Sequence, residues 1–195
     1  MIVRKILLLY SLTIGIFFSA FTARTKDLAR VSTDFSLLGH DGKEHSLADY
    51  KDAKAIVVMF VATQCPVSNG FNARMVELAN IYMPQGVVFL GINSNRQEKW
   101  DEVKSHAEKY GFPFVVLKDE NNVIADQYQA QVTPEVYVLT VAGELLYHGR
   151  IDDTATVDER KSEDLKKALD DILAGKAPAI ASTKAFGCTI KRIAK

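Results

Sequence analysis

The chain has 195 residues, of which 48% are hydrophobic and 25% charged, a composition typical of a globular protein that buries a core. Its formal net charge is +0, so the chain lacks the excess of positive charge that nucleic-acid binding requires. The length favours one domain with short additions.

The N-terminal residues predict export. Arg4 and Lys5 precede an apolar run from Ile6 to Phe21, which is the pattern of a secretory signal peptide. The run is short for a bilayer-spanning helix, which needs about 20 residues, but no clear cleavage site follows it. Residues 1–23 are therefore either a cleaved signal peptide or a retained membrane anchor. We expect an exported protein, periplasmic or anchored facing the periplasm, with membrane contact only if this segment is retained.

The rest of the chain alternates between strand and helix patterns. In chain order we expect a hairpin over 34–51, a strand over 55–62, a helix over 68–83, a strand over 87–93, a helix over 96–111, a strand over 112–119, a short helix over 121–128, two strands over 133–151 and a helix over 162–175. The strand over 55–62 is continuously apolar and β-branched, as in strands buried on both faces of a sheet.

This order predicts an α/β fold with a central sheet, helices on both faces and an N-terminal β-hairpin. The two strands over 133–151 are joined by a tight turn and must be antiparallel, so the sheet is mixed. We assign residues 32–175 to this domain and residues 176–195 to a C-terminal tail that carries Cys188. Phe186 and the β-like pattern after it suggest that the tail docks on the domain.

Cys65 stands between a buried strand and the longest helix, where α/β folds place their sites. Pro66 suits the first helical position and makes Cys65 the approximate N-cap. The unpaired N–H groups and the positive end of the helix dipole stabilise a thiolate there, which is the reactive form of cysteine. The alternative is a buried, inert cysteine.

Ser68 lies one turn into the same helix, close enough to donate its hydroxyl to the Cys65 sulfur. It cannot resolve a disulfide, so Cys65 is resolved by another thiol or not at all. Three roles are open for Cys188: a resolving thiol for Cys65, a partner in a permanent disulfide with Cys65, or a link to another chain. Lys184, Lys191 and other nearby cations favour its thiolate form.

The segment "FVATQCPVS" resembles the active site of the AhpC/TSA-type and thioredoxin-like proteins, which have a thioredoxin-like fold. Cys65 falls on the nucleophilic cysteine of that family and Ser68 on the second one. "VTPEVYVL" resembles a second landmark, a cis-proline before a strand, which implies a cis bond at Pro134. The resemblance further implies that Thr133 and Pro134 bind substrate beside the sulfur. Glu135 would lie near the site as a third candidate substrate-binding residue that could handle protons, and the favoured alternative is a solvated strand-end glutamate.

Two family features are replaced in this chain. Met59 stands where thioredoxins have a buried acid, and Val58 and Ala62 stand where peroxiredoxins have a proline and a threonine. Thr63 is one place from that threonine position and is the candidate for its role. The missing threonine argues against strong peroxidase activity, and Ser68 in place of the second cysteine argues against a dithiol mechanism within the motif.

We therefore interpret the chain as an exported thiol-disulfide oxidoreductase with Cys65 as nucleophile and Cys188 as candidate resolving thiol. The alternatives are a thiol peroxidase acting on hydroperoxides and a redox-inactive module that binds extended peptide. Expected partners are a thiol or disulfide protein or a small thiol donor. The four histidines show no metal-ligand spacing, and we expect no cofactor. Arg74, on the helix after Cys65, is expected to be solvated.

Overall fold

The computed structural model describes residues 35–194. The signal peptide or anchor predicted over residues 1–23 lies outside the described residues. Within the described part of the chain, no helix is both long enough and apolar enough to cross a membrane.

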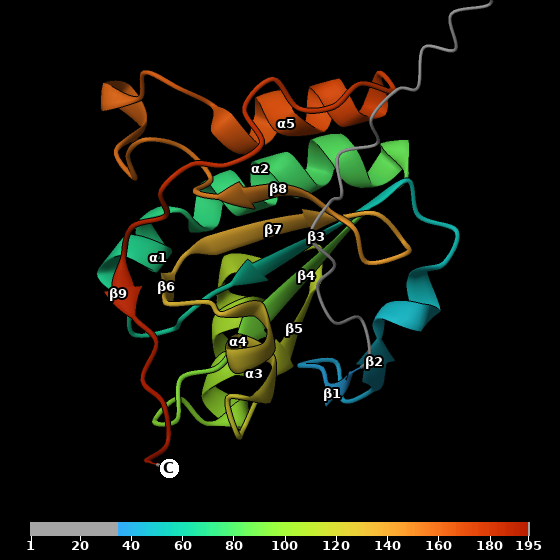
Figure 1. Cartoon of the computed structure of the whole chain (residues 1–195). Coiled ribbons are helices and arrows are strands. Elements are labelled where there is room, and N and C mark those ends of the chain that lie inside the picture. Colours follow the sequence, from blue (N-terminus) through green and yellow to red (C-terminus); the bar gives the residue numbers. More distant parts are fainter. Residues whose placement is uncertain (1–34, 195) are drawn as a thin grey trace, which may run out of the picture.

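A five-stranded mixed sheet forms the centre of the molecule (Figure 1). Its order is β5-β4-β3-β7-β8, with β3 at Ala55–Phe60, β4 at Val87–Asn93, β5 at Val115–Lys118, β7 at Glu135–Leu139 and β8 at Leu145–Gly149. β3, β4 and β5 run parallel, whereas β7 is antiparallel to both β3 and β8. Every residue of β3 is buried, because both faces of the sheet are covered. The predicted mixed α/β sheet is therefore confirmed.

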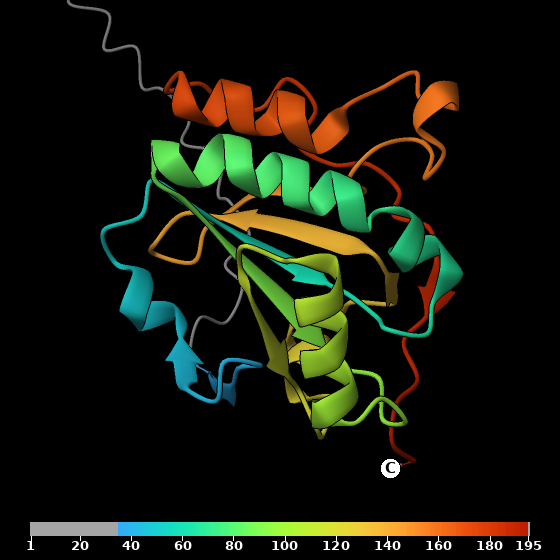
Figure 2. The same ribbon diagram turned by 180° about the vertical axis from the view of Figure 1, so that it is seen from behind.

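Helices cover both faces of the sheet, as predicted. The α-helices are α1 (Pro66–Gly70), α2 (Asn72–Tyr82), α3 (Trp100–Tyr110), α4 (Val123–Tyr128) and α5 (Asp164–Leu173), and three short 3₁₀ helices are η1 (Leu47–Tyr50), η2 (Met83–Gln85) and η3 (Val157–Glu159). Apolar side chains of α2, α3 and α5 pack on one face, and those of α4 and η1 on the other. α2 and α5 lie side by side in both views (Figures 1 and 2), joined by a 2.6 Å hydrogen bond from Tyr82 to Asp170.

The helix predicted over residues 68–83 is divided in two. It begins earlier, at Pro66, and breaks at Phe71 between α1 and α2. The N–H of Phe71 bonds to the carbonyl of Ser68, three residues back, at 3.0 Å, which tightens the last turn of α1. The break turns the short helix that carries the Cys65 junction away from the axis of the long one (Figure 1).

Two smaller strand pairs complete the fold. β1 (Ser36–Leu38) and β2 (Glu44–Ser46) form the predicted N-terminal hairpin. β6 (Val132–Thr133) pairs antiparallel with β9 (Cys188–Thr189), so the C-terminal tail is docked on the domain. The tilted contact between the rings of Phe186 and Phe71, with centroids 6.0 Å apart, supports that docking.

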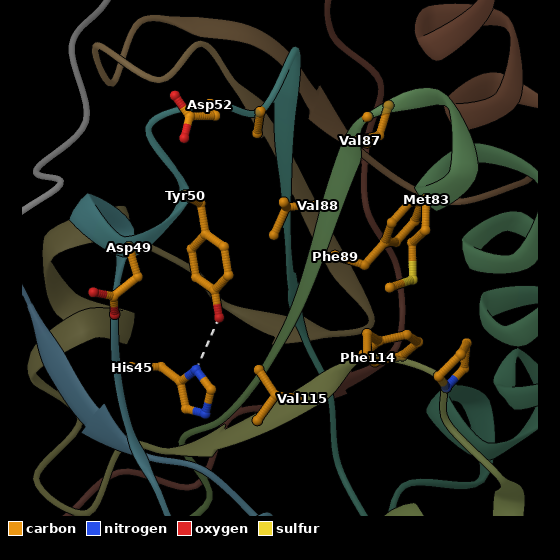
Figure 3. Close-up of a pocket in the computed structure, with 13 residues that line it drawn as sticks. His45, Asp49, Tyr50, Asp52, Met83, Val87, Val88, Phe89, Phe114 and Val115 are labelled. Atoms are coloured by element: carbon orange, nitrogen blue, oxygen red, sulfur yellow. Dashed lines mark hydrogen bonds between the residues drawn. The ribbon is translucent and has the colours of Figure 1, made fainter.

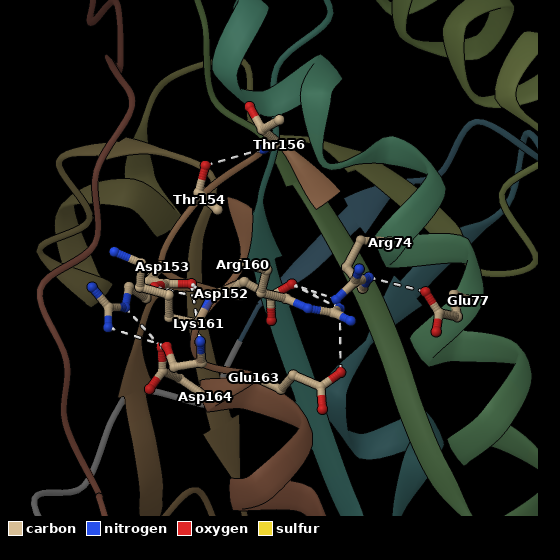
Figure 4. Close-up of polar contacts among 12 residues, drawn as sticks. Arg74, Glu77, Asp152, Asp153, Thr154, Thr156, Arg160, Lys161, Glu163 and Asp164 are labelled. Carbon is tan, nitrogen blue, oxygen red and sulfur yellow. Dashed lines mark hydrogen bonds and ion pairs between the residues drawn. The ribbon is translucent and has the colours of Figure 1, made fainter. Parts of the chain in front are cut away.

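The expectation that Arg74 is solvated is wrong. Arg74 is 7% exposed and its guanidinium forms ion pairs with Asp152, at 2.5 Å, and with Glu77. Figure 4 shows Arg74 and Arg160 converging on Asp152, with Glu163 beside Arg160. Burial raises the pKa of Asp152 to about 6 against the attraction of Arg74, so the carboxylate is charged at neutral pH. The cluster fixes α2 to the segment that follows β8.

Replacing Arg74 by methionine should lower the free energy of unfolding by about 3 kcal/mol at neutral pH, because the buried Asp152 carboxylate loses its closest cation. Urea unfolding followed by circular dichroism measures the change. The double variant Arg74→Met/Asp152→Leu should recover most of the loss, since no buried charge is then left uncompensated. A single-variant loss below about 1 kcal/mol would show that the pair behaves like a surface ion pair.

Candidate functional site

Cys65 is the N-cap residue of α1, at the carboxyl end of the central strand β3. Its backbone is extended (φ −85°, ψ 116°), and Pro66 occupies the first helical turn, as the sequence predicts. The sulfur accepts a hydrogen bond from the backbone N–H of Ser68 at 3.3 Å. Because the residue is only 4% exposed, this bond forms away from bulk water.

Thr133 and Pro134 form the wall opposite Cys65. Their peptide bond is cis, which confirms the sequence expectation. The carbonyl oxygen of Thr133 lies 3.3 Å from Cys65 Sγ, and the protonated thiol donates to it. The Thr133 hydroxyl is buried and makes no hydrogen bond of ordinary geometry within residues 35–194, but it lies close enough to the Cys65 sulfur to help lower the pKa of Cys65.

β9 brings Cys188 to the same place from the other end of the chain. Cys188 pairs with Thr133 in the antiparallel ladder, and it lines the same cavity as Cys65, close enough for its thiol to lower the pKa of Cys65. Both cysteines are free thiols in the structure. The tail therefore places a second thiol where the local sequence around Cys65 offers only Ser68.

The pKa values of the two thiols are shifted in opposite directions. Burial alone would raise the pKa of Cys65, but hydrogen bonds donated to its sulfur by the Cys188 thiol and the Ser68 N–H outweigh burial and lower the pKa. Burial and the neighbouring Cys65 sulfur raise the pKa of Cys188 and outweigh the lowering by Lys191, so the expectation that nearby cations favour its thiolate form is wrong. Cys65 is thus the thiol that ionises first and the better nucleophile of the two at neutral pH.

Ser68 and Thr63 are placed differently from what the sequence suggests. Ser68 is fully buried and contacts the Cys65 sulfur through its backbone N–H, while its hydroxyl oxygen accepts the N–H of Ala62 at 3.2 Å. The Thr63 hydroxyl donates to Glu102 on α3 and not to Cys65. Ser68 therefore supports the loop before Cys65, and Thr63 anchors that loop to α3.

Glu98 is a residue of the site that the sequence did not reveal. It is 1% exposed, and its carboxylate accepts the backbone N–H of Thr63 at 2.8 Å and that of Gln64 at 3.1 Å. It also accepts a hydrogen bond from the side chain of Asn93 at the end of β4. A buried carboxylate thus fixes the two residues before Cys65. No local pattern separates Glu98 from the exposed glutamates around it.

The expectation that Glu135 is solvated is wrong. Glu135 is 5% exposed, and one carboxylate oxygen accepts the N–H groups of Gln131 and Val132 while the other accepts hydrogen bonds from Tyr137 and His148. Burial would raise the pKa of Glu135, but these hydrogen bonds outweigh it and lower the pKa. Glu135 holds β6 in position for Cys65.

A cavity of about 260 Å³ lies over the two sulfurs, lined by Cys65, Cys188, Thr133, Gln64, Glu98 and Lys191 among others. A larger apolar cavity of about 480 Å³ lies elsewhere, between η1 and the starts of β4 and β5 (Figure 3). It holds the hydrogen-bonded pair His45 and Tyr50 but no cysteine. Because sites of α/β folds form at the carboxyl ends of parallel strands, we assign the chemistry to the smaller cavity.

Replacing Cys188 by alanine should move the pH profile of Cys65 alkylation to higher pH, because the largest donor to the Cys65 thiolate is removed. Iodoacetamide labelling of Cys65 as a function of pH, read by peptide mass spectrometry, measures the shift. Cys188→Ser retains a hydroxyl donor and should shift the profile less. Identical profiles for alanine, serine and the unchanged chain would show that Cys188 does not act on the Cys65 thiolate.

Comparison with known proteins gives relatives that match most of the chain. The chain is 28% identical over 141 residues to the thiol-disulfide oxidoreductase ResA of Geobacillus thermodenitrificans (strain NG80-2), covering 72% of this chain and 79% of that protein. It is 26% identical over 157 residues to the chloroplastic peroxiredoxin Q of Gentiana triflora, covering 72% of this chain and 70% of that one.

The structure is also similar to the crystal structure of a hypothetical protein from Sinorhizobium meliloti 1021. The two agree with a TM-score of 0.80 and 31% identity over 86% of this chain and 96% of that one. The mixed sheet, the helices on both faces and the cis bond before Pro134 give the predicted thioredoxin-like fold. The model of the AhpC/TSA family matches residues 29–148, more than half of the sequence, and the chain belongs to that family.

Proposed function

We propose that this protein is an exported thiol-disulfide oxidoreductase in which Cys65 is the nucleophile and Cys188 the resolving thiol. The observation that carries the proposal is the pairing of Cys188 with Thr133, which holds its thiol against the Cys65 sulfur. Cys188 takes over the task that the second cysteine of a C-x-x-C motif performs, a position filled here by Ser68.

In the first step the Cys65 thiolate attacks one sulfur of a substrate disulfide. A new S–S bond forms between Cys65 and that sulfur, the substrate S–S bond breaks, and the second substrate sulfur leaves as a thiolate with the bonding electron pair. The Ser68 N–H and the Cys188 S–H stabilise the attacking thiolate and lower the pKa of Cys65.

In the second step Cys188 resolves the mixed disulfide. While Cys65 is a thiolate, its charge and hydrogen bond help to raise the pKa of Cys188. Once Cys65 is bound in the mixed disulfide that charge is gone, so Cys188 loses its proton more readily. The Cys188 thiolate attacks Cys65 Sγ and the remaining substrate thiolate leaves. The substrate has gained two electrons, the Cys65–Cys188 pair is oxidised, and a thiol donor must reduce it to close the cycle.

A thiol peroxidase is the second candidate, favoured by the likeness to a peroxiredoxin Q and by the Thr133 hydroxyl, which lies near the Cys65 sulfur and helps to lower the pKa of Cys65. The Cys65 thiolate would attack the peroxide O–O bond, giving a sulfenic acid and an alcohol or water after protonation, and Cys188 would condense with the sulfenic acid and release water. The Thr63 hydroxyl is bonded to Glu102, which argues against Thr63 assisting that step.

A redox-inactive peptide-binding module is the weakest candidate. Such a module would use the edge of β6 beside Pro134 to hold extended peptide, and β9 of the same chain already pairs with that edge.

The proposal of export rests on the basic residues and apolar run at residues 1–23. It suits a two-cysteine redox cycle, because disulfides persist outside the cytoplasm.

Treating the reduced protein with bis(2-hydroxyethyl) disulfide should convert it to a form that lacks two free thiols and carries an intramolecular Cys65–Cys188 disulfide. Intact-mass spectrometry after alkylation measures this. Cys188→Ser should stop at a stable mixed disulfide on Cys65, because no thiol resolves it, while Cys65→Ser should not react at that site. A Cys188→Ser variant that turns over as fast as the unchanged chain would exclude Cys188 as resolving thiol.

A further inference from the structure

The C-terminal tail crosses the carboxyl ends of the central strands, where it contacts β6 and the loops after β4 and β5. On one side its β9 segment pairs with β6, where Thr189 faces Val132 and Cys188 faces Thr133. The N–H of Ile190 extends this ladder to the carbonyl of Gln131 at 2.9 Å. Figure 1 shows β9 beside β6, with the tail continuing along the same end of the sheet.

The opposite side of the tail is bonded as well. The N–H of Arg96, in the loop after β4, donates to the carbonyl of Lys191 at 2.9 Å, and the N–H of Lys191 donates to the side chain of Asn95 at 2.8 Å. Farther along, the N–H of Ile193 donates to the side chain of Asn122 at 2.8 Å. Residues 188–193 therefore form a strap that is fixed by hydrogen bonds on both sides.

Side chains of the strap anchor it in the domain. Ile190 is 3% exposed and packs in the core that lies on the α4 face of the sheet. Arg192 forms a 2.9 Å ion pair with Asp126 on α4 and donates to the carbonyl of Ala130. The strap is thus an element of the folded domain with its own apolar and ionic contacts.

Gly187 allows the strap to approach β6 closely. Its φ is +152°, and a Cβ atom at this position would lie 2.0 Å from the carbonyl oxygen of Thr133. No side chain fits in that space, because Cβ atoms do not approach backbone atoms so closely. The contact is between backbones directly beside Cys65 and the cis bond before Pro134.

This arrangement decides what can reach Cys65. An extended polypeptide that adds a strand to a sheet edge needs unpaired backbone groups on that edge. Here the Gln131 carbonyl and the β6 ladder at Thr133 are paired with the strap, and the N–H groups of Gln131 and Val132 are bonded to Glu135. What remains is the 260 Å³ cavity, smaller than the roughly 300–1,000 Å³ of ordinary ligand pockets. Its lining offers the amides of Gln64 and Gln97 and the ammonium of Lys191.

We infer that the docked strap, residues 188–193, is the specificity determinant of the site: it admits low-molecular-weight disulfides and excludes polypeptide disulfides. This inference rests on the proposed thiol-disulfide exchange. A polypeptide disulfide reacts only in molecules in which β9 has left β6, and the strap occupies the place of that polypeptide, with Cys188 where the substrate cysteine would lie.

The test compares two substrates that share the same leaving thiol. One is bis(2-hydroxyethyl) disulfide, and the other is an unstructured peptide of about ten residues whose single cysteine is disulfide-bonded to 2-mercaptoethanol, long enough to pair along a strand. The ratio of their second-order rate constants for modification of Cys65 is the readout. A change in the pKa of Cys65 affects both substrates alike and cancels in this ratio.

Gly187→Ala should undock the strap. The rate constant for the small disulfide, divided by that for the peptide, should then fall about tenfold, which corresponds to roughly 1.4 kcal/mol. Gly175→Ala is the matched control: Gly175 also has a positive φ of +72°, but nothing lies within 4 Å of its Cβ position, so the ratio should stay unchanged. Arg192→Ala, which weakens the strap outside the cavity, should change the ratio in the same direction as Gly187→Ala.

A peptide that modifies Cys65 of the unchanged chain as fast as the small disulfide does would overturn the inference while leaving the proposed function intact. The inference is also overturned if Gly187→Ala and Arg192→Ala both leave the ratio unchanged although hydrogen exchange shows residues 188–193 released. If neither substrate reacts at Cys65 in any variant, the proposed function fails and the inference fails with it.

Discussion

The antiparallel pairing of Cys188 with Thr133 is the interaction on which the site depends. It joins the last strand of the chain to the residue before Pro134, and Thr133 in turn contacts the Cys65 sulfur through its carbonyl oxygen. Without the pairing, Cys65 would be an N-cap cysteine with a serine one turn away and no second thiol. With it, two thiols share one buried cavity, and hydrogen bonds from the second lower the pKa of the first.

Two buried carboxylates hold the walls of this cavity in place. Glu98 accepts two backbone N–H groups from the loop before Cys65, and Glu135 accepts two from the start of β6. Backbone N–H groups left unpaired in a buried loop would cost free energy, so each carboxylate stabilises the position of one wall. Neither carboxylate is bonded to a cysteine. Both act on the geometry of the sulfurs through the backbone.

The sequence predicted the parts of the fold that depend on local pattern. The continuous apolar run before Cys65 became the central strand, Pro66 marked the helix start, and Pro134 is preceded by a cis bond. These features succeed because strand burial, helix capping and the preference of cis bonds for proline are set by neighbouring residues.

The features that the sequence did not predict depend on contacts between distant residues. Arginine and glutamate side chains are usually solvated, yet Arg74 and Glu135 are both buried. Arg74 is paired with Asp152, and Glu135 is bonded to His148 and to two backbone N–H groups. The same holds for Glu98. Periodicity gives the face of an element but not the identity of the charged group that will meet it, so buried ion pairs escape a pattern-based prediction.

Placing the resolving thiol on a tail strap has a consequence that a C-x-x-C motif does not share. In a C-x-x-C motif both sulfurs lie on one helical turn, so oxidation ties no distant segment of the chain to the site. Here the proposed Cys65–Cys188 bond would tie the strap covalently to the site, whereas hydrogen bonds, Ile190 and the Arg192 ion pair alone hold it in the reduced protein.

Local opening of the strap in the reduced protein needs only these noncovalent contacts to break. The reduced form is therefore the one in which the strap can leave β6, and it is also the form whose Cys65 thiolate attacks a disulfide. In the proposed cycle, access for a larger substrate and the capacity to reduce it thus occur in the same redox state, and oxidation ends both together.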